Sequence, residues 1–144
     1  DDDTWAKMQS LYKIWSDRQD QKENDVENES QAIARLRGIS IRLNLFCLGL
    51  FVENRLIGYT INETRQNYEG QPNFATNLFE HADTSFTGVF PVLMQQTAVE
   101  LLKLGHEYLS HQQDLGLPGL RKSKEDLHPA FFLKKYTIKN ISNS

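Results

Sequence analysis

The sequence predicts an α+β fold, in which helices flank a mixed, mainly antiparallel sheet. Three observations predict it. Apolar residues recur at helical spacing near the N-terminus, two apolar strand-like segments follow across a short turn, and a later helical segment is followed by further short strands. Because 144 residues is the size of one ordinary domain, we expect these elements to share one core over residues 1–144.

The N-terminal part is predicted to form two helices. From Trp5 to Asp20, apolar and aromatic side chains recur every three or four residues, which indicates one amphipathic helix. Residues 19–30 have the composition of a polar loop, and Ser30 is then suited to cap a second helix. That helix is predicted to run to about Ile41, although residues 39–45 also alternate in the way that strands do.

The middle of the chain is predicted to form three strands. An apolar strand from Phe46 to Val52 is followed by a turn at Glu53 and Asn54 and by a second strand, Arg55–Thr64, which together make a hairpin. Residues 66–73 form a loop in this prediction. Phe74–His81 is the third strand.

The last part is predicted to combine a crossover helix with short elements. A helix from about Val89 to Gly105 accepts Pro91 in its first turn, where the missing N–H costs nothing. A short strand at Glu107–His111, a short helix at Leu120–Leu127 and a final strand at Ala130–Ile138 follow. A strand, a helix and a further strand in this order predict a crossover within one sheet.

Composition excludes several classes of protein. The single cysteine, Cys47, cannot form an internal disulfide and suits a cytoplasmic protein. The longest apolar stretch, residues 43–52, is about half the length that a membrane helix needs. The net charge is −3, with acidic residues concentrated in residues 1–30 and basic residues in 111–139, so a polyanion or the inner face of a membrane would meet the C-terminal part first.

Four segments resemble, in order and at suitable spacing, one known family. They are GYTINE at 58–63, FEHAD at 79–83, QQDLGLPGLRKSKEDLHP at 112–129 and FLKKY at 132–136. They are similar to the C-terminal domain family of phosphatidylglycerol lysyltransferases, which has a GNAT-like fold. The resemblance implies that this chain is the second half of a tandem of GNAT-like halves. The opening residues DDDTWAKM, which lack an initiator methionine, are those expected of a processed or excised fragment.

The resemblance implies an aminoacyl or acyl transferase. Members of the family move an aminoacyl group from an aminoacyl-tRNA to a lipid headgroup, and the same chemistry serves other amine or hydroxyl acceptors. His81 stands where the family has lysine, and Asn77 and Glu80 stand near positions that bind the transferred lysine in the family, so lysine itself is not expected. The glycine loop that binds acetyl-CoA in GNAT enzymes is absent, which makes acetyl-CoA the less expected donor.

An alternative is a noncatalytic binding or structural half-domain. In that interpretation the chain contributes part of a cleft and pairs with an upstream GNAT half or with a second copy of itself. An ordinary acetyl-CoA-dependent N-acetyltransferase is the third hypothesis.

Four acidic or basic side chains lie at or near predicted strand ends, where a GNAT-like cleft would hold its acid and base groups. They are the candidate catalytic residues Glu63, Glu80, His81 and Asp83. A histidine at a strand end is also commonly a hydrogen-bonded structural residue. These residues have no metal-ligand spacing, so no metal site is predicted.

Two loops supply candidate anion-binding residues. One holds Thr84, Ser85, Thr87 and Gly88 before the long helix, where backbone N–H groups could bind a phosphate or carboxylate, or where the same residues could simply cap the helix. The other is QDLGLPGLRKSK at 113–124, where Asp114 is expected to pair with Arg121, and Arg121 and Lys124 share a helix face. That loop fits a structural role and a ligand-binding role equally well.

Overall fold

The computed structural model describes residues 2–18, 23–65, 73–134 and 136–139, and it divides the chain into two compact units. The first unit, residues 1–112, contains the sheet and the three longer helices. The second unit, residues 113–144, contains one short helix, α4 (Pro118–Glu125).

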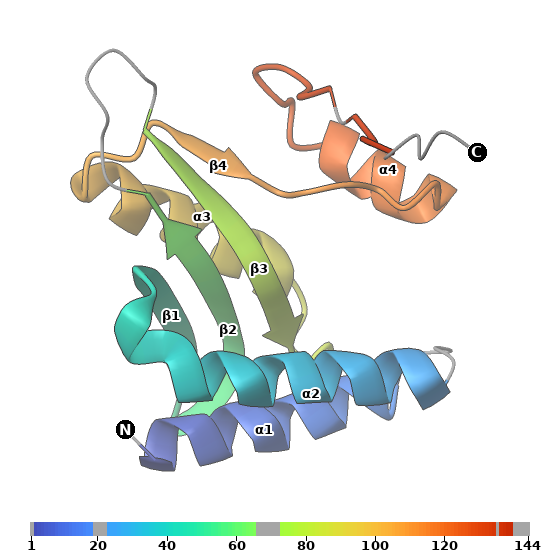
Figure 1. The fold of residues 1–144 in the computed structure, drawn as a ribbon. Coiled ribbons are helices and arrows are strands. Elements are labelled where there is room, and N and C mark those ends of the chain that lie inside the picture. Colours follow the sequence, from blue (N-terminus) through green and yellow to red (C-terminus); the bar gives the residue numbers. More distant parts are fainter. Residues whose placement is uncertain (1, 19–22, 66–72, 135, 140–144) are drawn as a thin grey trace. The chain divides into compact units, whose positions relative to one another are not determined.

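The sheet of the first unit has four strands in the order β1-β2-β3-β4 (Figure 1). The strands β1 (Leu45–Val52), β2 (Arg55–Thr64) and β3 (Phe74–Ala82) pair antiparallel, and β4 (Tyr108–Ser110) runs parallel to β3. The predicted α+β class with a mixed, mainly antiparallel sheet is therefore confirmed.

The β1–β2 hairpin has the predicted two-residue turn. Glu53 and Asn54 have φ values of 47° and 65°, which is the left-handed conformation that a type I′ turn requires at both central residues. The bounds of β2 agree with the prediction, because its apolar residues and the turn before it mark the same limits.

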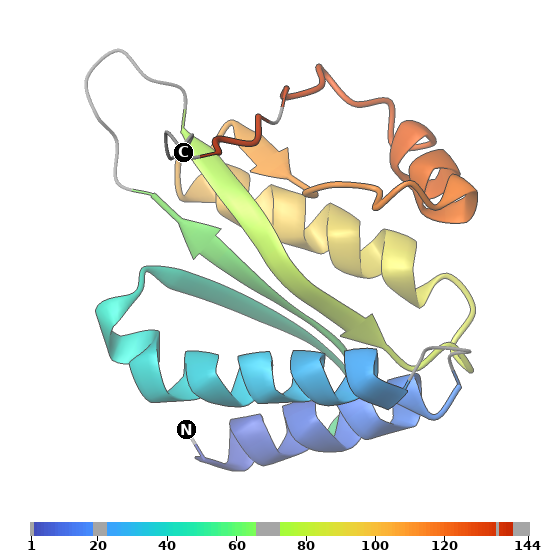
Figure 2. The ribbon, with the colours of Figure 1, turned by 45° about the vertical axis from the view of Figure 1, so that its right-hand side comes forward.

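Helices cover both faces of this sheet (Figures 1 and 2). On one face, α1 (Asp2–Ser16) and α2 (Glu23–Ile39) bury a core against β2 that includes Met8, Leu11, Leu36, Leu56, Tyr59 and Ile61. On the other face lies α3 (Val89–Lys103), whose buried stripe is Val89, Leu93, Thr97 and Leu101. Gly58 of β2 allows α3 to approach, since a Cβ there would lie 3.4 Å from Leu93.

The prediction for residues 19–30 was wrong where the structure describes them. Helix α2 begins at Glu23, so Ser30 lies in its interior rather than at its N-cap. Glutamate and glutamine are good helix formers, and the solvent side of a surface helix has the composition of a loop. The ambiguous residues after α2 form a short 3-10 helix, Ser40–Arg42, and not a strand.

The predicted final strand was also wrong. Residues 130–134 and 136–139 form no regular element, and Phe132, Tyr136 and Ile138 are 75%, 78% and 96% exposed. Aromatic and β-branched residues favour a strand, but a strand also needs a partner for its backbone. The described residues of the second unit contain no other strand. The predicted loop at 66–73 lies outside the described residues except for Asn73.

Across the described parts of the chain, no helix is both long enough and apolar enough to cross a bilayer.

Candidate active site

The sheet opens beside β3. Strand β4 pairs with only the first three residues of β3, Phe74–Thr76, and the two strands then diverge (Figure 2). At the point of divergence, the side-chain Nε2 of Gln112 donates a hydrogen bond of 2.6 Å to the carbonyl of Asn77. Within the described residues of the first unit, no strand pairs with the outer edge of β3 beyond this point. The sheet therefore presents an open strand edge.

The pairing of β3 with β2 determines which backbone groups face that open edge. The N–H of Asp83 donates to the carbonyl of Ile57 at 2.8 Å, which directs the backbone of Asp83 toward β2. In an antiparallel pair, alternate residues direct their N–H and C=O groups to opposite sides. The backbone groups of Glu80 and Ala82 therefore face away from β2, but Ala82 is 0% exposed, so only those of Glu80 lie where an extended acyl group could bind.

A β-bulge brings two polar side chains together at this edge. Ile61 of β2 lies opposite Phe79, whereas the next residue, Asn62, lies opposite Asn77, so Leu78 is an extra residue in β3. The side-chain Nδ2 of Asn77 donates a hydrogen bond of 3.1 Å to Oε2 of Glu80.

Burial and a hydrogen bond act in opposite directions on Glu80. Its side chain is half-buried, and this burial raises the pKa of the carboxyl group above its usual value, while the hydrogen bond from Asn77 lowers it. A carboxylate with a raised pKa is a stronger base than an ordinary one, which is the property that a general base needs.

A series of buried hydrogen bonds links α3 to the face of the sheet on which Glu80 lies. Thr97 of α3 donates its hydroxyl proton to the carbonyl of Leu93 at 2.8 Å, so Thr60 must be the donor in its 3.1 Å contact with Thr97. Thr60 in turn accepts a hydrogen bond of 2.9 Å from Nδ2 of Asn62. Since Thr60 lies opposite Glu80, these hydrogen bonds hold in place the part of β2 that pairs with Glu80.

Asp83 is a buried anchor rather than a base. Its Oδ1 accepts hydrogen bonds from the Ser85 hydroxyl at 2.7 Å and the Ser85 N–H at 3.0 Å, and also pairs with Arg18, while its Oδ2 pairs with Arg55. The Ser85 hydroxyl is the first of the groups that lower the pKa of Asp83, which falls to about 2. The carboxylate is 0% exposed, and both of its oxygens already have partners.

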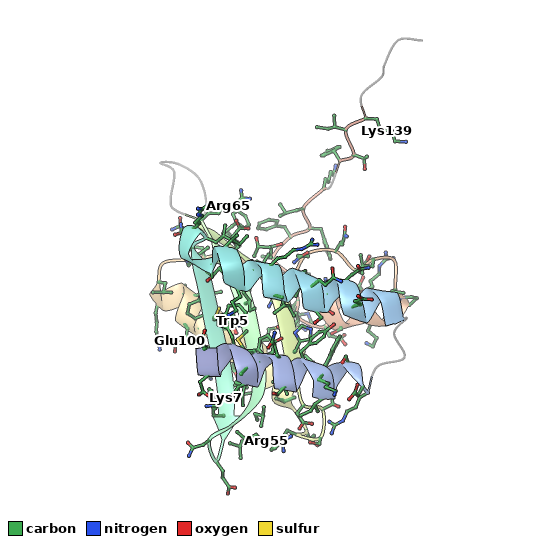
Figure 3. The ribbon with its side chains drawn as sticks, turned by 60° about the horizontal axis from the view of Figure 1, so that its bottom comes forward. Trp5, Lys7, Arg55, Arg65, Glu100 and Lys139 are labelled. Carbon is green, nitrogen blue, oxygen red and sulfur yellow. The ribbon has the colours of Figure 1, made fainter. Side chains whose placement is uncertain are left out.

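The loop after Asp83 lies beside these two arginines. Arg18 lies in the turn that follows α1, and its side chain is 43% exposed. Arg55 is the first residue of β2 (Figure 3), and its side chain is 55% exposed. Two cations around one carboxylate leave one net positive charge. The guanidinium of Arg55 also lies 5.7 Å from the centre of the Phe86 ring.

The predicted anion-binding residues Thr84, Ser85, Thr87 and Gly88 are exposed in this loop. Gly88 adopts a φ of 79° as the N-cap of α3. The first turn of α3 offers few amide donors, because Val89 already donates to the carbonyl of Phe86 and Pro91 has no N–H. An anion here would depend more on the arginines than on the helix start.

His81 is enclosed on the face of the sheet opposite to Glu80. It is 1% exposed, and its ring lies edge-on to Tyr12 and Trp15 and is tilted against Tyr59, with centroid distances of 4.9, 4.5 and 5.3 Å. Its Nε2 lies 3.3 Å from a carboxylate oxygen of Glu29 on α2. This arrangement fits a buried structural histidine better than a group that contacts a substrate.

Glu63 lies far from the other candidates. It pairs with Thr76 at the beginning of β3, whereas Ala82 at the end of β3 pairs with Gly58. Five residues of β2 separate the two positions, which corresponds to about 17 Å along a strand. Glu80 lies opposite Thr60, three residues or about 10 Å along β2 from Glu63. The structure therefore places the loop 84–88 at the end of the sheet away from Glu63, with Glu80 between them.

The candidate residues of the second unit bond to one another. Arg121 pairs through Nε with Asp114, whose other oxygen accepts the Gly116 N–H at 2.9 Å. Lys124 donates a hydrogen bond of 2.7 Å to the carbonyl of Gln113. The predicted Asp114–Arg121 pair is thus present, and it closes the loop before α4.

Sequence reasoning missed Arg18 and Arg55. They lie 65 and 28 residues from Asp83, and no local spacing indicates that they meet. The one available signal was the position of Arg55 directly after the predicted hairpin turn, at the end of the sheet where β3 also ends.

Comparison with known proteins supports the fold. No family model and no curated protein matches the chain. A conserved protein of unknown function from Bacteroides thetaiotaomicron VPI-5482 superposes with a TM-score of 0.73 at 24% identity, over 90% of this chain and 42% of that one. This chain therefore spans less than half the length of the Bacteroides protein.

Two acetyltransferases are also similar in structure. A ribosomal-protein-alanine N-acetyltransferase from Brucella melitensis biovar Abortus 2308 has a TM-score of 0.63 at 15% identity, over 94% of this chain and 92% of its own. A GNAT family acetyltransferase from Staphylococcus aureus subsp. aureus USA300_TCH1516 has a TM-score of 0.58 at 17% identity, over 96% and 90%. The fold is therefore GNAT-like, whereas the resemblance to the lysyltransferase family remains a prediction.

Proposed function

We propose that this protein is a GNAT-type acyltransferase whose reaction takes place at the open edge of β3. The observation that carries the proposal is Glu80, a half-buried carboxylate with a raised pKa, whose outward-facing backbone groups pair with no described strand of the first unit. The similarity to acetyltransferases supports acyl transfer as the class of reaction. The identities of the acyl donor and of the acceptor are proposed on additional observations.

The proposed reaction needs a base and an oxyanion site. Glu80 accepts the proton as the nitrogen or oxygen of the acceptor attacks the acyl carbonyl and forms the new bond. The backbone N–H of Glu80, at the open edge, donates to the oxyanion of the tetrahedral intermediate. The intermediate then collapses, the bond to the leaving group breaks, and the leaving oxygen or sulfur takes up the proton that Glu80 removed from the acceptor, which restores the carboxylate.

We propose an aminoacyl ester, such as the acceptor end of an aminoacyl-tRNA, as the donor. The segments 58–63, 79–83 and 112–129 support this choice through the family that they resemble. The first turn of α3 has few amide donors for a pyrophosphate, which makes acetyl-CoA the less favoured donor. Arg18 and Arg55, with the hydroxyls of the loop 84–88, would hold a backbone phosphate of the donor.

The acceptor is an amine or hydroxyl of a small molecule or lipid headgroup. Glu63, His81 and Asp83, predicted as catalytic, have no part in this mechanism. Glu63 lies at the other end of β2, His81 is enclosed, and Asp83 is saturated with donors. Arg121 and Lys124 of the second unit remain candidates for binding an anion, and the Arg121→Ala variant tests them separately.

Thermal unfolding with candidate donors tests the binding step. The wild-type chain is heated alone and with acetyl-CoA, an amino-acid amide, or a short RNA hairpin carrying a nonhydrolysable aminoacyl group. A specific ligand at a hundred times its dissociation constant stabilises the folded state by about 2.7 kcal/mol. A shift with the aminoacyl hairpin that is lost in Arg55→Ala supports the proposal, and a shift with acetyl-CoA alone contradicts the choice of donor.

Transfer assays with matched variants test the base. Transfer to a panel of amines should fall by about 10²–10⁴-fold in Glu80→Gln, while Glu100→Gln, an exposed substitution on α3, serves as the control. A loss in Glu63→Gln with full activity in Glu80→Gln would contradict the assignment. Absence of any ligand shift and of any transfer would instead favour the noncatalytic half-domain.

A further inference from the structure

The strand β1 has the sequence of an interior strand but lies at the edge of the sheet. Its residues Leu45–Val52 contain no charged side chain and no proline. Continuous apolar runs of this kind are typical of strands that are covered on both sides. In the first unit, none of its eight residues is fully buried, and Phe51 and Val52 are 53% and 43% exposed.

The pairing with β2 determines which groups of β1 face outward. The N–H of Thr64 donates to the carbonyl of Asn44 at 2.8 Å, so Asn44 directs its backbone toward β2. Alternation then directs Phe46, Leu48 and Leu50 toward β2 as well. The backbone groups of Leu45, Cys47, Gly49 and Phe51 face the outer edge, where the described residues of the first unit form no further strand. The N–H of Leu45 already donates to the carbonyl of Leu43 at 2.9 Å, which leaves the N–H groups of Cys47, Gly49 and Phe51 for a partner strand.

Within the described residues of the first unit, this edge has none of the usual features that prevent pairing. Natural edge strands are protected by charged residues, proline, bulges or a covering segment. The register shift of this hairpin lies between Leu50 and Phe51, where β2 and not β1 carries the extra residue, so β1 stays regular over Leu45–Leu50. The strand is long enough, at eight residues, to pair over its whole outer side.

We propose that β1 pairs antiparallel with β1 of a second copy of this chain, so that two four-stranded sheets form one continuous sheet. The strand suits an identical partner, because it brings no charges that would repel each other. A two-fold axis beside Gly49 places Gly49 opposite its own copy and Cys47 opposite Phe51 of the second copy. Cys47, Gly49 and Phe51 then pair with outward-facing residues of the second copy, and the interface closes as a dimer.

The oligomeric state of the 144-residue chain tests this proposal. Light scattering after size exclusion, over a dilution series, should give twice the monomer mass of 16.7 kDa. A monomer at every concentration, or a series of larger species, would overturn the proposal, since a two-fold interface closes after two copies. The outcome is independent of any acyltransferase activity.

Variants at the outward N–H groups locate the interface. Cys47→Pro removes an N–H that makes no bond to β2, and an edge strand tolerates proline at such a position. Because the symmetry removes two hydrogen bonds at once, the dissociation constant should rise by at least about tenfold. Cys47→Ala retains the N–H and is the matched control, which should remain a dimer.

A second variant tests the same interface in case Cys47→Pro does not fold. Phe51→Lys places a charge at the exposed end of the strand and should also yield monomers. Far-UV circular dichroism and the unfolding temperature must stay close to those of the wild-type chain in the variant that is used. A dimer that persists in folded Cys47→Pro and Phe51→Lys would overturn the assignment of the interface to β1.

Discussion

The side-chain Nδ2 of Asn77 donates a 3.1 Å hydrogen bond to Oε2 of Glu80, across the extra residue that the bulge inserts into β3. Without the bulge, residues three apart in a strand would point to opposite faces. The bulge therefore creates this pair, and the pair opposes the effect of burial on the pKa of Glu80.

Asn77→Ala should raise the pKa of Glu80 further. The substitution removes the one hydrogen bond that lowers it and leaves the burial that raises it. The carboxyl carbon of Glu80, followed by NMR across a pH titration, should titrate at a higher pH than in the wild-type chain. In the transfer assay, the acid limb of the pH–rate profile should move in the same direction, and an unchanged titration would contradict the coupling.

Glu80→Gln should change stability with a definite pH dependence. A carboxyl group whose pKa is higher in the folded state stabilises the fold below its unfolded pKa, and this contribution is lost as the pH rises through the folded pKa. The wild-type chain should therefore lose stability relative to Glu80→Gln between pH 4.5, the ordinary value, and neutral pH. Urea unfolding at both ends of this range measures the difference, and a constant difference would exclude the raised pKa.

Asp83→Asn should destabilise the first unit by about 1–3 kcal/mol at neutral pH, because Arg18 and Arg55 lose the charge that they share. The pKa of Asp83 is lowered in the folded state, so its contribution is present above 3.8 and is lost as the pH falls toward 2. The difference between wild type and variant in urea unfolding should shrink over that window. Asp3→Asn, which removes the exposed pair with Lys7, is the control and should cost less than about 1 kcal/mol.

Thr97→Val should lower the free energy of unfolding by about 1–3 kcal/mol, although the two side chains have nearly the same shape. The hydroxyl of Thr60 donates to Thr97 in a site where both residues are 0% exposed, so valine leaves that hydroxyl without its acceptor. Thr97→Ser keeps the acceptor and should retain more of the stability, as measured by urea unfolding. Equal losses in the two variants would show that methyl packing, and not the hydrogen bond, is what Thr97 contributes.

Local patterns were sufficient to predict the antiparallel strands of the sheet. The bounds of β2 and the turn at Glu53 and Asn54 follow from apolar residues and turn residues that are adjacent in sequence. Helix α2 was placed too late because the residues from Glu23 onward have the composition of a loop while they form the solvent side of a helix. The strand predicted at Ala130–Ile138 has the right residues but no described partner strand in its unit.

The candidate site was predicted less well, because its geometry depends on contacts between distant residues. Glu80 was one of four candidates from the sequence, and the bulge at Leu78 that pairs it with Asn77 leaves no mark in the sequence. The partners of Asp83 and His81 come from distant parts of the chain, since Arg55 of β2 lies 28 positions from Asp83, while Glu29 of α2 and Tyr12 of α1 contact His81.

Arg121→Ala tests whether the loop before α4 is held by its own ion pair. The hydrogen bond from Arg121 is the largest of the effects that lower the pKa of Asp114, so this pKa should rise in the variant. The N–H of Gly116, which donates to the same carboxylate, should then exchange faster with solvent. Lys122→Ala, which breaks only the exposed pair with Asp126, should leave both measurements unchanged. If Arg121→Ala alters neither, the guanidinium does not hold the loop, and binding of a phosphate or carboxylate becomes the better explanation for a basic residue at this position.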